Sequence, residues 1–74
     1  MNLKVKLFAT FREGRGKEVF FDIEAGTIVG DIIQKLKLKE VDIAILLVNG
    51  RDAKLDTKLQ EGDYMSLFPP VGGG

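Results

Sequence analysis

The last three residues, Gly72, Gly73 and Gly74, offer the clearest chemistry in this sequence, because the final group is an unhindered glycine α-carboxylate. A carboxylate is a poor electrophile, so it reacts at its carbonyl only after it has been given a good leaving group. Attack at that carbonyl needs open approach, which a glycine offers and a β-branched residue would hinder. Gly73 lets the backbone lie close against the wall of a channel. We expect Gly74 to react and Gly73 to assist it; the alternative is a terminus without function.

The residues before these glycines set how the tail leaves the folded part of the chain. Pro69 and Pro70 fix φ and favour a stiff, extended exit, and Val71 and Gly72 follow them. We expect residues 1–70 to form one small domain and residues 71–74 to form a flexible tail. Because a flexible tail loses entropy when it enters a channel, the binding energy must come from other residues.

The composition excludes most classes of enzyme. The 74 residues include no histidine and no cysteine, so a catalytic dyad or triad, a thiolate nucleophile and an iron–sulfur cluster all lack their essential residues. The carboxylates, lysines and single tyrosine show no spacing typical of an acid/base pair. We therefore expect a protein that is not an enzyme on its own and that binds no metal and no cofactor.

Charge and hydropathy restrict the partners and the location. The formal net charge is zero, which argues against nucleic acid as a partner. No apolar run approaches the length of a membrane span, and no charged and apolar leader follows Met1. The lack of cysteine fits a reducing compartment. We expect a cytoplasmic protein without a membrane partner.

The first part of the sequence predicts a β-hairpin. Leu3, Val5 and Leu7 alternate with polar residues, as in a strand with one buried face, and we expect this strand to continue through residues 8–10. Residues 13–16 supply a turn, and a second alternating segment follows at residues 19–23.

A helix is predicted after Gly26. Thr27 is the expected N-cap, and Asp31 lies in the first turns, where its charge favours the helix dipole. Gly30 weakens the prediction. The apolar residues fall on one helical face at spacings of three and four: Ile28, Val29, Ile32, Ile33 and Leu36.

The second half predicts two more strands. The continuous apolar run 43–48 is typical of a central strand buried on both faces, and Asn49-Gly50 predicts the turn after it. Leu55 and Leu59 are expected to seal the core. In the last strand, residues 64–68, alternation buries Met65 and Leu67 and turns Phe68 outward, beside the tail.

The order of strand, strand, helix, strand, irregular segment and strand predicts an α+β fold, a β-grasp (ubiquitin-like) roll. We expect a mixed sheet of four to five strands with one main helix. If the first and last strands pair, they must be parallel, because a helix-length crossover separates them.

Three stretches together resemble one family. Residues 7–13, L-F-A-T-F-R-E, resemble the first-strand signature of the small subunit of molybdopterin synthase. Residues 61–63, E-G-D, resemble the turn that opens that family's last strand, and residues 68–74, F-P-P-V-G-G-G, match its F-P-P-V-x-G-G ending. The resemblance spans the whole chain.

This resemblance implies a sulfur carrier. A ubiquitin-activating-type adenylyltransferase uses ATP to adenylate the terminal glycine, and sulfur from a persulfide donor protein replaces AMP to leave a thiocarboxylate. The large subunit of molybdopterin synthase then accepts the tail, and the thiocarboxylate provides dithiolene sulfur to a pyranopterin precursor. ATP is used by the partner enzyme, so this chain itself binds no cofactor.

Docking on these partners is predicted for residues at the root of the tail. Phe68 is an exposed aromatic anchor in this prediction and Phe8 its neighbour, although most phenylalanines in so small a domain belong to the core. Arg12 pairs with an acidic partner surface, or is simply solvated. Residues 69–72 complete the predicted partner-binding segment.

Three alternatives remain open. The thiamine-pathway sulfur carrier shares the fold and the Gly-Gly end, and V-N-G-R at residues 48–51 resembles it. A protein modifier joined to lysines uses the same acyl-adenylate. A β-grasp binding module with an inert tail would work without Gly73 and Gly74.

Overall fold

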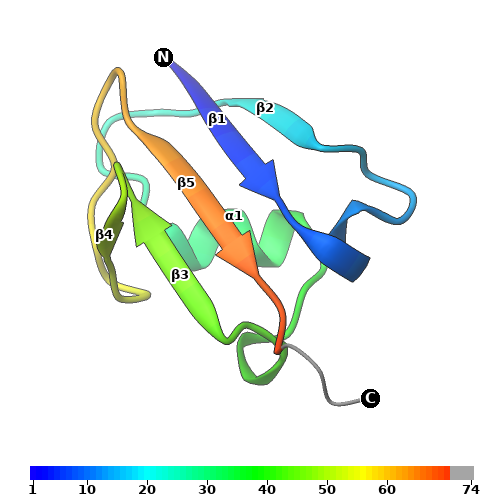
Figure 1. The fold of residues 1–74 in the computed structure, drawn as a ribbon. Helices are drawn as coiled ribbons and strands as arrows, with labels where there is room; N and C mark the ends of the chain where they lie inside the picture. Colours follow the sequence, from blue (N-terminus) through cyan, green and yellow to red (C-terminus); the bar gives the residue numbers. More distant parts are fainter. Residues whose placement is uncertain (71–74) are drawn as a thin grey trace.

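The computed structural model describes residues 1–70 and shows one helix packed across a mixed sheet of five strands (Figure 1). The strand order is β2-β1-β5-β3-β4. The elements are β1 (Asn2–Leu7), the 3-10 turn η1 (Ala9–Arg12), β2 (Glu18–Asp22), α1 (Val29–Lys35), the 3-10 turn η2 (Glu40–Asp42), β3 (Ile45–Val48), β4 (Arg51–Asp52) and β5 (Tyr64–Phe68).

The first and last strands lie side by side in the centre of the sheet and run parallel. Val5 pairs with Met65 and Leu7 with Leu67, while β1 is antiparallel to β2 and β5 is antiparallel to β3. This arrangement confirms the predicted β-grasp roll. It also brings the end of β1 next to the end of β5, from which the tail leaves.

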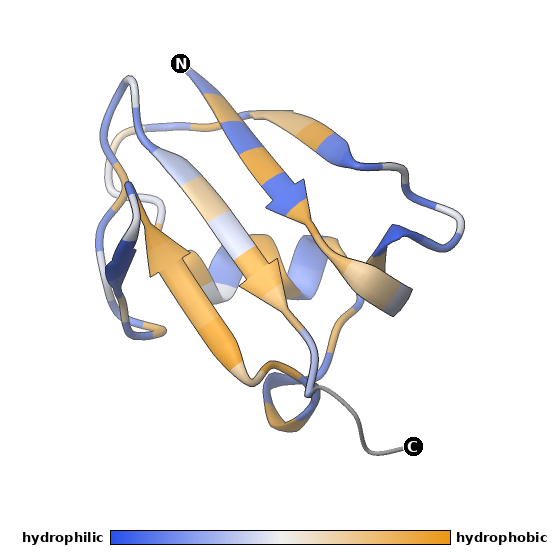
Figure 2. Ribbon diagram, in the orientation of Figure 1, coloured by the Kyte–Doolittle hydropathy of each residue, from blue (hydrophilic) through white to orange (hydrophobic). Residues whose placement is uncertain are grey.

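The core lies between α1 and the face of the sheet toward it. Along β1 apolar and polar residues alternate, so one set points to the helix, whereas β3 is apolar along its whole length (Figure 2). Leu55 and Leu59 contribute to the core as expected. The fully or nearly fully buried apolar residues are Leu3, Val5, Leu7, Phe11, Ile23, Val29, Ile32, Ile33, Leu36, Leu59, Met65 and Leu67.

The prediction that the first strand continues through residue 10 is wrong. The strand ends at Leu7, and Ala9 takes a left-handed conformation with φ 53°. The chain then winds into η1, where the backbone N–H of Phe11 donates to the carbonyl of Phe8 at 3.1 Å. An alanine rarely adopts this conformation, so the alternating pattern gave no sign of the bend.

The N-cap of the helix lies one residue later than predicted, and the helix begins at Val29. Ile28 occupies the N-cap, and the carboxylate of Asp31 accepts a hydrogen bond from its backbone N–H at 3.1 Å. Thr27 instead donates its hydroxyl to the carbonyl of Glu24. A close backbone contact explains the glycine at position 30. The N–H of Gly30 donates to the carbonyl of Leu55 at 2.9 Å, and a Cβ there would lie 3.4 Å from that oxygen.

The run at residues 43–48 does not form a central strand buried on both faces. The strand β3 starts at Ile45 and is second from the edge of the sheet, with only the two-residue β4 beyond it. Ile45 is 47% exposed, because no element among residues 1–70 covers the face of the sheet away from α1 (Figure 1). Hydrophobicity alone does not reveal how many layers cover a strand.

One arginine ties the β1–β2 connection to the end of the helix. The guanidinium of Arg15 donates to the carbonyls of Phe11 and Leu36 at 3.3 and 3.2 Å, and Leu36 is the C-cap of α1. We expect Arg15→Met to lower the free energy of unfolding by about 1–3 kcal/mol, because it removes a charged donor from two carbonyls. Chemical denaturation measures this loss. The control Arg51→Met, at an exposed position in β4, should change stability by less than about 0.5 kcal/mol; equal losses would contradict the role of Arg15.

Candidate functional site

Two aromatic rings stack at the point where the tail leaves the sheet. Phe8 follows β1 and Phe68 ends β5, and because these strands are parallel neighbours the rings meet. Their centroids are 4.1 Å apart and their planes differ by 9°. Both side chains are half-buried, so an edge of the pair faces solvent. The structure thus brings together the two phenylalanines that the sequence analysis singled out.

Arg12 covers the other side of this pair. The guanidinium carbon lies 5.2 Å from the centroid of the Phe8 ring, and the Nε group donates to the carbonyl of Leu7 at 2.7 Å.

 The left-handed backbone at Ala9, with φ 53°, turns the chain back over the end of β1. A planar cation held over an aromatic face by a second hydrogen bond has little freedom, so the three side chains form one ordered stack.

A fourth residue of this surface was not predicted. Ile45 pairs directly with Phe68 across the antiparallel strands, so their side chains lie on the same face of the sheet. The apolar run had suggested burial on both sides, but the helix covers only the other face of the sheet, so Ile45 is exposed. We call Phe8, Arg12, Ile45 and Phe68 the aromatic patch.

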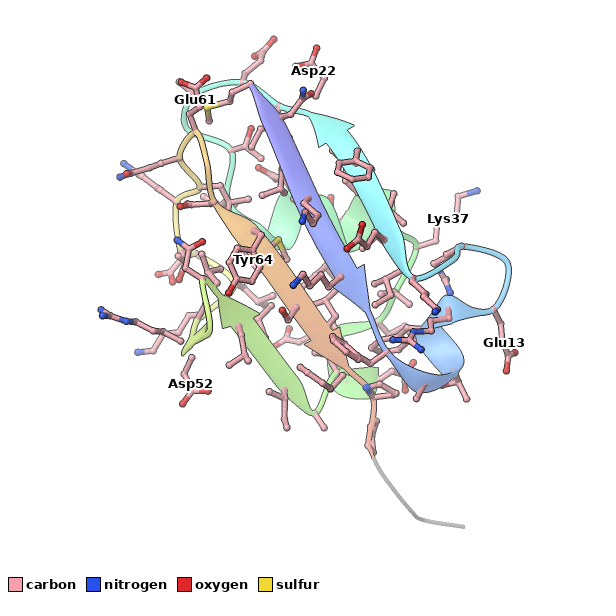
Figure 3. The ribbon with its side chains drawn as sticks, turned by 45° about the horizontal axis from the view of Figure 1, so that its top comes forward. Glu13, Asp22, Lys37, Asp52, Glu61 and Tyr64 are labelled. Carbon is pink, nitrogen blue, oxygen red and sulfur yellow. The ribbon has the colours of Figure 1, made fainter. Side chains whose placement is uncertain are left out.

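Two lysines lie beside the aromatic patch on the same face of the sheet, and Glu18 of β2 lies opposite Lys6. Lys4 and Lys6 point outward from β1, and the Lys6 ammonium lies 5.0 Å from the centroid of the Tyr64 ring. Figure 3 shows Tyr64 lying on the face of the sheet away from α1. An acidic partner surface would therefore find both apolar contacts and positive charge on this side.

The tail leaves from the aromatic patch. Pro69, which is half-buried, and the exposed Pro70 follow Phe68 directly. The predicted roles of Val71, Gly72, Gly73 and Gly74 fall outside the described residues. The geometry of residues 1–70 thus places the aromatic patch directly before the segment at which the predicted tail begins.

Other kinds of site find no support in the part of the chain that the structure describes. Within residues 1–70, no three His, Cys, Asp or Glu side chains are grouped so as to hold a metal ion. Likewise, no helix among these residues is long and apolar enough to cross a membrane.

The stack predicts a measurable effect of Arg12. We expect Arg12→Met to lower the free energy of unfolding by about 1 kcal/mol, because the cation–π contact and the hydrogen bond to Leu7 are lost. The ring-proton NMR shifts of Phe8 and Phe68 should move toward values typical of unstacked rings. Arg12→Lys, which keeps the charge, should lose less stability than Arg12→Met and should shift the ring-proton signals less. Unchanged ring shifts in Arg12→Met would show that Arg12 does not order the stack.

Comparisons with known proteins agree with this geometry. The model of the ThiS family matches residues 5–74. Small archaeal modifier protein 3 of Haloferax volcanii is 35% identical over an alignment of 92 positions, which covers 100% of this chain and 100% of that protein.

Two solved structures are also similar. The putative molybdopterin converting factor, subunit 1, from Pyrococcus furiosus is 32% identical, with a TM-score of 0.81 over 96% of this chain and 99% of that chain. A complex of subunits 1 and 2 of the molybdopterin-converting factor from Helicobacter pylori contains a chain that is 25% identical, with a TM-score of 0.66 over 100% of both chains. The family match over residues 5–74, the relative aligned along its whole length and the ubiquitin-like β-grasp topology show that the chain belongs to the ThiS family.

Proposed function

We propose that this protein is a sulfur carrier whose Gly74 carboxylate is adenylated and then converted to a thiocarboxylate. The observation that carries the proposal is the stack of Phe8 on Phe68 at the root of the tail. It provides a docking surface next to a thin chain end without placing bulky groups at the reacting carbonyl. Membership of the ThiS family and the terminal glycines support the same function.

The chemistry needs three steps on partner proteins. A carboxylate oxygen of Gly74 attacks the α-phosphorus of ATP on an adenylyltransferase of the ubiquitin-activating type, and pyrophosphate leaves. A persulfide sulfur of a donor protein then attacks the carbonyl carbon, and AMP leaves. A thiol cleaves the S–S bond of the resulting acyl disulfide, so that the thiocarboxylate remains on Gly74. The chain contributes the carboxylate and the docking surface, ATP stays with the partner, and a reducing cytoplasm supplies the thiol.

We further propose that the sulfur is used to make molybdopterin, with this chain as the small subunit of molybdopterin synthase. The printed descriptions of the Pyrococcus furiosus and Helicobacter pylori structures, a molybdopterin converting factor subunit 1 and a complex of subunits 1 and 2, support this. In that complex the large subunit would bind the aromatic patch and receive the tail. The other sulfur-transfer pathway to consider is thiamine synthesis, because the matching family carries the name ThiS.

A second candidate function is protein modification. The 35% identity to Small archaeal modifier protein 3 favours it. A lysine amine of a target protein would attack the same acyl-adenylate, AMP would leave, and an isopeptide bond to Gly74 would form. The aromatic patch serves both functions equally, because both begin on the activating enzyme.

A stepwise reconstitution separates these candidates. The purified protein is incubated with the activating enzyme, ATP, a persulfide donor and a thiol, and then with the large synthase subunit and the pyranopterin precursor. We expect a thiocarboxylate after the first stage and molybdopterin after the second. A thiocarboxylate without molybdopterin would overturn the pathway but keep the carrier. Lysine conjugates without a thiocarboxylate would favour the modifier.

A further inference from the structure

A second surface lies at the β4 edge of the sheet, opposite the edge formed by β2. A groove of about 530 Å³ runs beside β3 and β4, and its apolar lining includes Ile33, Ile43, Leu46 and Leu55. These residues come from the helix, from the segment before β3, from β3 and from the loop after β4. Because the lining combines the helix with residues before β3, in β3 and after β4, no local pattern indicated the groove.

The groove is shaped by a short edge strand. The ladder between β3 and β4 pairs Leu47 and Val48, and the N–H of Ala53 donates to the Leu46 carbonyl at 3.1 Å, so at the start of β3 Ile45 has no strand neighbour on that side within residues 1–70. Beyond β4 the loop is fixed to the helix, since the carbonyl of Leu55 accepts from Gly30 and the carbonyl of Thr57 accepts from Val29, at 2.9 and 3.0 Å. The wall opposite β3 is therefore held in place, and an uncovered strand end borders the open side.

The rim of the groove is acidic. Glu40, Asp52 and Asp56 line it, and Lys54 is the positive residue in the same lining. All four are exposed. Among residues 1–70, the ion pair that the structure contains joins the N-terminal amine to Asp22, so the rim carboxylates are not neutralised by a salt bridge. Figure 3 shows Asp52 at the β4 edge, pointing away from the sheet.

The charge of the rim is opposite to that of the outer sheet face, where Lys4, Lys6 and Arg12 lie. Although the formal net charge of the chain is zero, the two surfaces are thus suited to partners of opposite sign. They meet at Ile45, which lines the groove and also pairs with Phe68 in the aromatic patch. The apolar surface is continuous from one to the other.

We propose that this groove, defined by Glu40, Leu46, Asp52, Leu55 and Asp56, binds an extended segment of a partner protein in which apolar side chains alternate with Lys or Arg. The apolar side chains would lie on Leu46 and Leu55, and the cations would meet the rim carboxylates. The uncovered end of β3 favours an extended segment over a helix, because such an edge accepts a further strand. The proposal needs the folded domain only and does not depend on the fate of Gly74.

The test uses two synthetic peptides with the same apolar pattern and opposite charge, Arg-Val-Arg-Val-Lys and Glu-Val-Glu-Val-Glu. Each is titrated at low salt into the full-length ¹⁵N-labelled protein. We expect the basic peptide to shift the amide signals of Leu46 and of residues 53–56, with an affinity that falls as salt is added. The acidic peptide should leave these signals unchanged. Shifts with neither peptide, or equal shifts with both, would overturn the proposal.

A charge reversal provides the matched control. We expect the double variant Asp52→Lys/Asp56→Lys to weaken binding of the basic peptide about tenfold, because two attractions become repulsions. Glu13→Lys/Glu61→Lys makes the same change in net charge at two exposed turn positions that lie away from Asp52 (Figure 3) and should bind normally. Equal weakening in both double variants would mean attraction to net charge alone and would contradict the groove as the site.

Two further measurements distinguish this proposal from a dimer and from the proposed carrier function. If the amide signals of the groove shift with protein concentration in the absence of peptide, its occupant is a second copy of this chain, and the proposed partner segment is wrong. Adenylation of Gly74 is measured on the same samples. Its absence from the unaltered protein would overturn the proposed carrier function and leave the peptide result standing.

Discussion

Deletion of Gly73 and Gly74 is expected to lower thiocarboxylate formation by more than about 100-fold while the fold stays intact. The deletion shortens the reach of the tail by about 7 Å, and misplacement of a reacting group by a single ångström already costs about 100-fold. The thermal unfolding midpoint should not change, because the core and all five strands lie within residues 1–70. The measurement is the rate of pyrophosphate release with the activating enzyme and ATP, followed by the mass of the product.

One control shows whether length is the cause. Gly73→Ala keeps the length of the tail and its terminal glycine, so it should lose much less activity than the deletion variant. A deletion variant that keeps its biological function would support the binding module with an inert tail instead of either carrier interpretation.

The second large effect concerns docking. We expect Phe68→Ala to weaken binding of the activating enzyme about 10- to 100-fold, because aromatic residues at the centre of an interface supply much of its binding energy. Loss of the ring also removes the stacking partner of Phe8. Isothermal titration calorimetry with the activating enzyme, together with thermal unfolding of the variant, measures affinity and folding separately.

Phe20→Ala is the matched control for Phe68→Ala. Phe20 is 63% exposed on β2 of the same sheet, where it pairs with Lys4 at a distance of two strands from β5. We expect it to bind normally. If Phe68→Ala proves unstable, Ile45→Ala removes a more exposed member of the aromatic patch and should still weaken binding. Normal binding by both Phe68→Ala and Ile45→Ala would rule out the patch as the docking surface.

The alternation of apolar residues was sufficient to predict the architecture. Leu3, Val5 and Leu7 point to the core as their period of two requires, and the parallel pairing of β1 with β5 follows from the crossover between them. The prediction that Phe8 and Phe68 are neighbours is also confirmed, because the parallel strands β1 and β5 end side by side. These features depend on local periodicity and chain order, which a sequence contains.

The features that could not be predicted from the sequence depend on contacts between distant segments or on unusual backbone conformations. The left-handed Ala9 bends the chain into η1 at a residue type that rarely does so. The exposure of Ile45 depends on the absence, among residues 1–70, of a second layer over its face of the sheet, not on the hydrophobicity of β3. The acidic groove needs segments separated by many residues to be folded together before its rim exists.

The most direct test of the central claim is the intact mass, with C-terminal fragmentation, of this protein isolated from its native cells under mild conditions. We predict a mass increase that corresponds to the replacement of one oxygen by sulfur, located at Gly74. An unmodified carboxylate that persists after incubation with the activating enzyme, ATP, a persulfide donor and a thiol would contradict the carrier function.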